Sequence, residues 1–208
     1  MKKIAAFPAL ALASALVIMS ACSGESTKSD EAKKPEAKAT ETKKTDEQTT
    51  IHYPEEKHLA NVRQLTFGGE NAEAYFSFDD QGVVFQKTNE KEGIPCDQIF
   101  YSPIPMENEK LQFNLISTGK GRTTCSYFMP GNETFVYAST HLGGDECPPT
   151  PDREKIKKYV WPLYPSYEIF IADKEGNIVQ QLTDNDYYDA EATVSPNGDK
   201  IVFTSTRS

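Results

Sequence analysis

The feature that most constrains the fold is a short β-hairpin pattern that occurs three times along the chain. In the last copy, a Ser-Pro-Asn-Gly turn at 195–198 joins two β-rich runs, 191–195 and 200–204. Proline favours the second position of a type I turn, and glycine takes the left-handed position that closes the hairpin. The same elements recur 66 and 118 residues earlier, so that position 196 corresponds to 130 and 78. A hairpin repeated in this way, with an insertion in the longer interval, predicts a β-propeller.

The pattern predicts an all-β fold: a partial β-propeller of about two and a half four-stranded blades after a disordered N-terminal segment. An outer strand is also expected at 61–66, with no blade before it. Because closed propellers need four to eight blades, so few blades would leave exposed edges, and we expect the chain to be truncated at its C-terminus. The expected strands are 74–78, 83–87, 98–102 and 111–117, then 124–129, 135–139, 167–172 and 178–183, and finally 191–195 and 200–206.

The first 21 residues predict a signal peptide. Lys2 and Lys3 precede an apolar run, 4–19, whose 16 residues are fewer than the ~20 that span a bilayer as a helix. The residues that follow, Met-Ser-Ala-Cys at 19–22, resemble the lipobox of bacterial lipoproteins, although methionine replaces the usual leucine. The resemblance implies that Cys22 is lipidated and becomes the mature N-terminus, and the alternative is an ordinary signal peptide.

Residues 22–50 predict a lipid-anchored, disordered tether. The segment 23–50 contains six lysines and seven acidic residues, with no apolar side chain larger than alanine or proline, so it cannot form a core. The remaining domain, 51–208, has 14 basic and 24 acidic side chains, a formal charge of −10. Such a charge disfavours binding to nucleic acid, and membrane contact is expected only through the anchor.

The last copy also carries a family resemblance. Segments 181–185 (Gln-Leu-Thr-Asp-Asn), 189–191 (Asp-Ala-Glu), 195–198, 201–203 (Ile-Val-Phe) and 205–207 (Ser-Thr-Arg) resemble the WD-like repeat of TolB-type propellers. The resemblance covers most of 59–208 and implies a TolB-like propeller in the bacterial cell envelope. The chain departs from TolB itself because it lacks an N-terminal α/β domain and has a lipid-anchor signal.

The candidate binding residues lie in loops that would share one face of the blades. A proline-rich insert, 140–166, contains Tyr159, Trp161 and Tyr164, which are either ligand anchors or, as we favour, side chains that pack onto their own blade. On the same face, the acidic loop 184–189 includes Asp184 and Asp186 as weaker candidates. These carboxylates could bind calcium, but the loop lacks the pattern of an EF-hand, so turn hydrogen bonds are favoured.

Three cysteines remain after Cys22. An oxidising envelope favours one disulfide and one free thiol, and we expect Cys125 to pair with Cys147 because both belong to the second blade. No two cysteines have the spacing of metal ligands, so no metal site is expected.

The sequence contains no G-x-S-x-G or H-E-x-x-H motif, and we expect no enzyme activity and no cofactor. The favoured function is that of a lipid-anchored envelope module that binds a protein, peptide or glycan partner. The alternative is the substrate-gating propeller of a prolyl-oligopeptidase-like serine peptidase, whose catalytic domain would follow residue 208.

Overall fold

A computed structural model of the chain describes residues 53–107 and 109–207. The expected signal peptide (1–21), the lipidation site Cys22 and the tether (22–50) lie outside these residues. Among the residues described, no helix has the length and apolar character needed to cross a membrane.

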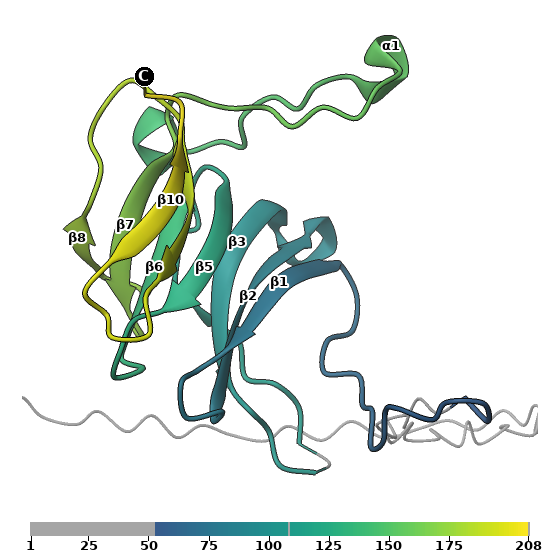
Figure 1. Ribbon diagram of the computed structural model, residues 1–208. Helices are drawn as coiled ribbons and strands as arrows, with labels where there is room; N and C mark the ends of the chain where they lie inside the picture. Colours follow the sequence, from purple (N-terminus) through teal and green to yellow (C-terminus); the bar gives the residue numbers. More distant parts are fainter. Residues whose placement is uncertain (1–52, 108, 208) are drawn as a thin grey trace, which may run out of the picture. The chain divides into compact units, whose positions relative to one another are not determined.

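The described chain is all-β and consists of antiparallel sheets (Figure 1). Two sheets have four strands each, in the orders β1-β2-β3-β4 and β5-β6-β7-β8, and a third has the two strands β9 and β10. The first sheet comprises β1 (Glu70–Phe76), β2 (Gly82–Asn89), β3 (Ile94–Pro103) and β4 (Asn114–Leu115). The second comprises β5 (Thr123–Phe128), β6 (Thr134–Ser139), β7 (Glu168–Asp173) and β8 (Ile178–Gln181), and the third β9 (Asp189–Val194) and β10 (Ile201–Ser205).

The sheets pack face to face, with the second between the other two (Figure 1). On β6, Phe135 and Tyr137 join the core shared with the first sheet, whereas Val136 and Ala138 join the core shared with β9 and β10. This division follows from the alternation of side chains along a strand. All four side chains are 0% exposed. The second sheet is therefore buried on both faces, and the series of sheets does not close into a ring.

The outer face of the first sheet has its own smaller apolar cluster. Val83, Phe85, Phe100 and Leu111 are buried there, and Leu65 packs against them. The buried Lys87 lies on the same face, where its ammonium pairs with Glu92 and lies 4.5 Å from the centre of a phenylalanine ring. Residues of loops, Leu65 and Leu111, therefore cover part of the outer face of the first sheet.

The expected strands agree closely with the observed ones, except at the edges of the first sheet. The strand expected at 61–66 is absent: only Arg63 forms an isolated bridge, and its guanidinium donates to the carbonyl oxygens of Pro105 and Met106. The strand expected at 111–117 is reduced to β4, because only two of its residues pair with β3.

The first strand of every sheet has a β-bulge. The pairing register shifts in β1, β5 and β9, and the bulged residues Glu73, Cys125 and Glu191 have positive φ angles of 48°, 38° and 60°. Backbones with positive φ are uncommon for residues other than glycine. A bulge bends the strand and re-aims its side chain, so these three residues leave the regular alternation of their strands.

Candidate functional site

The insert between β6 and β7 extends away from the sheets as an arm (Figure 1). It contains a 3₁₀ turn, η2 (His141–Gly143), and one turn of helix, α1 (Arg153–Ile156). The Asp152 side chain caps α1 by accepting from the backbone N–H groups of Glu154 and Lys155. The helical turn differs from the loop that the sequence predicts for 140–166.

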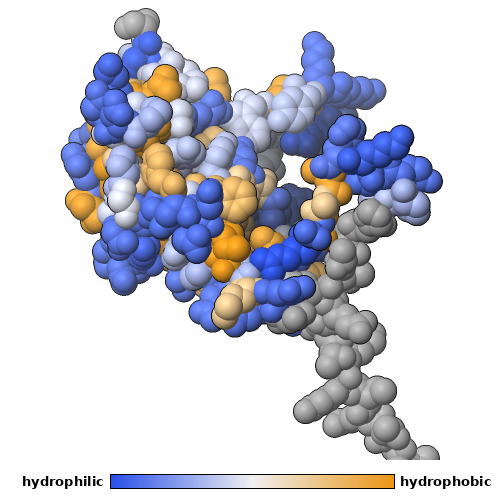
Figure 2. Space-filling model, turned by 60° about the horizontal axis from the view of Figure 1, so that its bottom comes forward, coloured by the Kyte–Doolittle hydropathy of each residue, from blue (hydrophilic) through white to orange (hydrophobic). Residues whose placement is uncertain are grey.

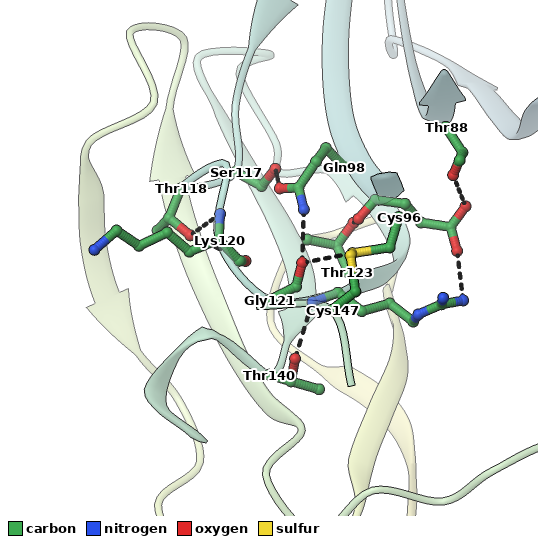
Figure 3. The surroundings of a disulfide bond; sticks show 12 residues. Thr88, Cys96, Gln98, Ser117, Thr118, Lys120, Gly121, Thr123, Thr140 and Cys147 are labelled. Carbon is green, nitrogen blue, oxygen red and sulfur yellow. Dashed lines mark hydrogen bonds and ion pairs between the residues drawn. A yellow bond between two sulfur atoms is a disulfide. The ribbon is translucent and has the colours of Figure 1, made fainter. Parts of the chain in front are cut away.

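A disulfide between Cys96 and Cys147 fastens the start of the arm to the first sheet (Figure 3). The expected pairing of Cys125 with Cys147 is therefore wrong, and Cys125 is the free cysteine of the described residues. That pairing would require the insert to pack against the second sheet, from which it extends. Instead the arm passes over the beginning of β3, where the Cys96 side chain is buried.

The segment that joins the first and second sheets, 116–122, packs closely against the disulfide. The carbonyl oxygen of Gly121 accepts from Gln98 at 2.8 Å and lies 3.0 Å from the Cys96 sulfur (Figure 3). Gly121 has a φ of +59°, and a Cβ there would meet the Thr140 hydroxyl at 2.7 Å. Only glycine fits this position without displacing the root of the arm.

Arg122 follows Gly121 and is held in a fixed orientation. Its Nη1 lies 3.2 Å from Asp97 Oδ2, and Asp97 Oδ1 accepts from the Thr88 hydroxyl at 2.8 Å. The Arg122 backbone N–H donates to the Thr140 hydroxyl at 2.9 Å. The side-chain Nε–H of Arg122 is buried and makes no hydrogen bond to the described residues. Arg122 therefore has a buried donor that the described residues do not satisfy.

Arg122 lines a pocket of about 340 Å³ between the arm and the second sheet. The walls are largely aromatic and proline side chains, with Trp161, Tyr164 and Tyr167 among them. The Tyr167 hydroxyl, buried next to Arg122, has its pKa raised well above the usual range by burial. The remaining lining residues are Thr150, Pro151, Arg153, Val160 and Pro162. Such a pocket suits a ligand with an apolar group and an acceptor oxygen.

The expected binding residues of the arm have different environments. Trp161 is 44% exposed and lines the pocket, so it is not buried against its own sheet. Tyr164 also lines the pocket but packs on the second sheet, and its hydroxyl donates to the Pro149 carbonyl oxygen. Tyr159 is 76% exposed and lies outside the pocket wall, with the Arg153 guanidinium 5.4 Å from its ring centre.

Asp184 and Asp186 do not join this pocket. Both are exposed in the loop before β9, where Asn185 makes the turn contacts: its side chain accepts from the Tyr187 N–H and donates to Asp189. Asp189 is fully buried and pairs with Arg207 at 3.3 Å. The Asp189 carboxylate thus bonds the side chains of Asn185 and Arg207. Within the described ranges, no group of three or more potential ligands could hold a metal ion.

A second group of polar residues, which the motif analysis missed, lies on the first strands of the three sheets. Burial first, and the neighbouring Glu73 carboxylate next, raise the pKa of the Cys125 thiol to about 12. Glu191 adds to this electrostatic effect. The sequence repeat could have identified these positions as equivalent. Position 191 corresponds to position 73 at the offset of 118 residues and to position 125 at the offset of 66 residues.

The raised pKa predicts an unreactive thiol at Cys125. At pH 8, iodoacetamide should modify Cys125 in the folded chain roughly a thousandfold more slowly than in the urea-unfolded chain, because thiolate is the reactive form. Mass spectrometry of the peptide that contains Cys125 measures both rates. Equal rates would show that Cys125 is neither buried nor next to carboxylates in solution.

Two other surfaces of the described chain are candidate sites. A hollow of about 280 Å³ lies on the outer face of the first sheet, and Leu65, Phe85 and Leu111 line it together with residues of β1. The side shown in Figure 2, seen from the lower end of Figure 1, is mostly hydrophilic with scattered hydrophobic patches. The hollow also has the polar side chains of Thr66, Asn71 and Glu73 in its lining, but it lacks the tryptophan and the arginines of the arm pocket.

No protein-family model matches the chain, and no curated protein is significantly similar to it. The resemblance to TolB-type propellers therefore stays a prediction from sequence.

Proposed function

We propose that the protein is a lipid-anchored binding module of the cell envelope, arranged as part of a TolB-like propeller, and that the arm pocket binds a peptide segment of a partner protein. The observation that carries the proposal is a pocket with aromatic walls that is lined by Arg122, a residue whose buried Nε–H has no partner among the described residues. A peptide offers both complementary parts: an apolar side chain for the walls, and a carbonyl or carboxylate oxygen for the donor.

The composition of the pocket favours a peptide over a glycan. The polar side chains of the lining are Thr150, Arg122 and Arg153, beside the ring groups of Trp161, Tyr164 and Tyr167. The two tyrosine hydroxyls already donate to backbone carbonyl oxygens of the chain. A sugar has hydroxyls on most of its carbons and would leave many of them unpaired there. A partly exposed tryptophan on a proline-rich segment is a suitable anchor for a peptide side chain, since little rotamer freedom is lost on binding.

Trp161 allows a direct test, because it is the only tryptophan of the chain. The purified full-length protein is screened against arrayed twelve-residue peptides and against peptidoglycan oligosaccharides, and tryptophan fluorescence identifies ligands. We expect peptides to bind, and calorimetry to show at least tenfold weaker binding by Trp161→Ala, in line with a central aromatic anchor.

The matched control is Tyr159→Ala, which removes an aromatic ring from the same arm but outside the pocket. Its affinity should stay within about twofold of the unmodified protein. Arg122→Lys keeps a cation opposite Asp97 and removes the Nε–H donor, so it should weaken binding as well. Ligands that are exclusively oligosaccharides, or peptides that bind Trp161→Ala normally, would contradict the proposal.

A further inference from the structure

The outer end of the arm concentrates basic side chains in an otherwise acidic region. The helix α1 lies at this end (Figure 1), and we call residues 153–159 the arm tip. Four of the 14 basic side chains of 51–208 belong to the arm tip, together with one acidic side chain, Glu154. The arm tip therefore has a formal charge of +3, whereas 51–208 as a whole has a formal charge of −10. The four basic residues are Arg153, Lys155, Lys157 and Lys158.

The local backbone keeps these cations in solvent. The single turn of α1 ends at Lys157, whose left-handed φ of 52° lets its N–H donate to the Arg153 carbonyl oxygen at 2.9 Å. Every residue of the arm tip is exposed. Lys155 pairs with Asp152 at 3.0 Å on the surface, and neither Lys157 nor Lys158 forms an ion pair with a described residue. Exposed ion pairs are weak, so the lysines of the arm tip remain available to an external anion.

Large apolar side chains lie among and directly after these cations. Ile156 and Leu163 are 42% and 53% exposed, and the rings of Tyr159 and Trp161 are exposed as well. None of the four belongs to a core cluster of the described chain. A partner that offers charge alone, such as a soluble polyanion, would leave these side chains in water. Lysine and arginine beside tryptophan and tyrosine are typical of segments at a bilayer surface, where the rings lie at the level of the headgroups.

We propose that the arm tip binds the surface of a bilayer that contains anionic phospholipids. The ammonium groups contact the lipid phosphates, while Ile156 and Tyr159 enter the boundary between headgroups and acyl chains. Charge complementarity selects this face of the protein, because the acidic remainder of the region is repelled by the same surface. Salt screens charges beyond about 8 Å at physiological ionic strength, so the local cluster acts in spite of the net charge of the region.

The inference goes beyond the proposed function, because it concerns the outer end of the arm and not the arm pocket. Lys155, Lys157, Lys158 and Tyr159 do not line that pocket. The inference also departs from the expectation that the membrane is contacted only through the lipid anchor, since that expectation rests on the net charge of the whole region. The disulfide fastens the arm to the first sheet, so a contact at the arm tip would fix the orientation of the sheets relative to the bilayer.

The test follows the arm itself by fluorescence of the full-length chain. The double variant Trp161→Phe, Tyr159→Trp moves the only tryptophan of the chain to position 159, outside the arm pocket. Vesicles of phosphatidylcholine brominated on its acyl chains are prepared with and without phosphatidylglycerol, because bromine quenches tryptophan only at close range. We expect quenching and blue-shifted emission with the anionic vesicles alone. A chain held only through an N-terminal lipid anchor would leave this tryptophan unquenched in both.

Two further substitutions in this reporter variant separate the arm tip from the rest of the chain. At a fixed concentration of anionic vesicles, Lys157→Gln together with Lys158→Gln should lower the ratio of quenched to unquenched tryptophan at least tenfold, because each lysine near an anionic surface contributes about fivefold. The matched control is the pair Lys57→Gln, Lys200→Gln, which changes the net charge equally on exposed lysines elsewhere. The control should change the ratio by less than about twofold.

Four outcomes would overturn the inference: no quenching, equal quenching by neutral and anionic vesicles, an equal loss in the control, or binding of heparin without quenching by lipid. The last of these would assign the cations to a soluble polyanion. Peptide binding that depends on Trp161 would stand in each case, and its failure would leave the quenching unchanged.

Discussion

Replacing both Cys96 and Cys147 with alanine is expected to lower the free energy of unfolding by about 4 kcal/mol. The bond joins residues 51 positions apart, and the entropy that a cross-link removes from the unfolded chain rises with the length of the closed loop. Cys96 is buried, so alanine is preferred to serine, whose hydroxyl would need a partner there. Urea unfolding of the full-length variant, followed by circular dichroism, measures the change.

Reduction provides the control for this prediction. A reducing agent should destabilise the unmodified protein by a similar amount and should leave the double variant unchanged. Cys125→Ala, which removes the free thiol, should cost about 1 kcal/mol, as a partly buried side chain with few partners does. A reduced protein as stable as the oxidised one would show that the bond contributes nothing to the folded domain.

The strands could be predicted because local turn chemistry identifies them. In the third copy, Gly198 takes the left-handed position and its N–H donates to the Ser195 carbonyl oxygen at 2.8 Å. Asp80 and Asn132 occupy the same position in the earlier copies, also with positive φ. Asp and Asn tolerate the left-handed region, so the same turn forms in each copy although the amino acid at this position differs. Period-two alternation then distributes the side chains between two faces.

The site could be predicted only in part, because its geometry depends on contacts between sheets. The insert and Trp161 were found from proline and aromatic content, but the path of the arm over β3 follows from no local pattern. The wrong partner for Cys147 has this cause: the order of the strands along the chain favours Cys125, whereas the arm crosses to Cys96 in the neighbouring sheet. The carboxylates of Glu73 and Glu191 were overlooked because a bulge that re-aims a side chain has no motif of its own.

Phe135→Ala is expected to be the most damaging single core substitution, with a loss of about 4 kcal/mol. The ring is fully buried between the first and second sheets, 4.9 Å from the ring centre of Phe128 and 5.4 Å from that of Tyr101. Alanine would leave a cavity that two hydrogen-bonded sheets cannot easily close. Phe76→Ala is the matched control, since this phenylalanine on β1 is 61% exposed and should cost less than about 1 kcal/mol.

The same substitution tests whether the sheets unfold together. The residue that follows Phe135, Val136, faces the core shared with β9 and β10, so one strand connects both interfaces. If Phe135→Ala shifts the entire urea transition, monitored by circular dichroism and by Trp161 fluorescence, the three sheets form one cooperative unit. Two separate transitions, or a loss near that of Phe76→Ala, would contradict this.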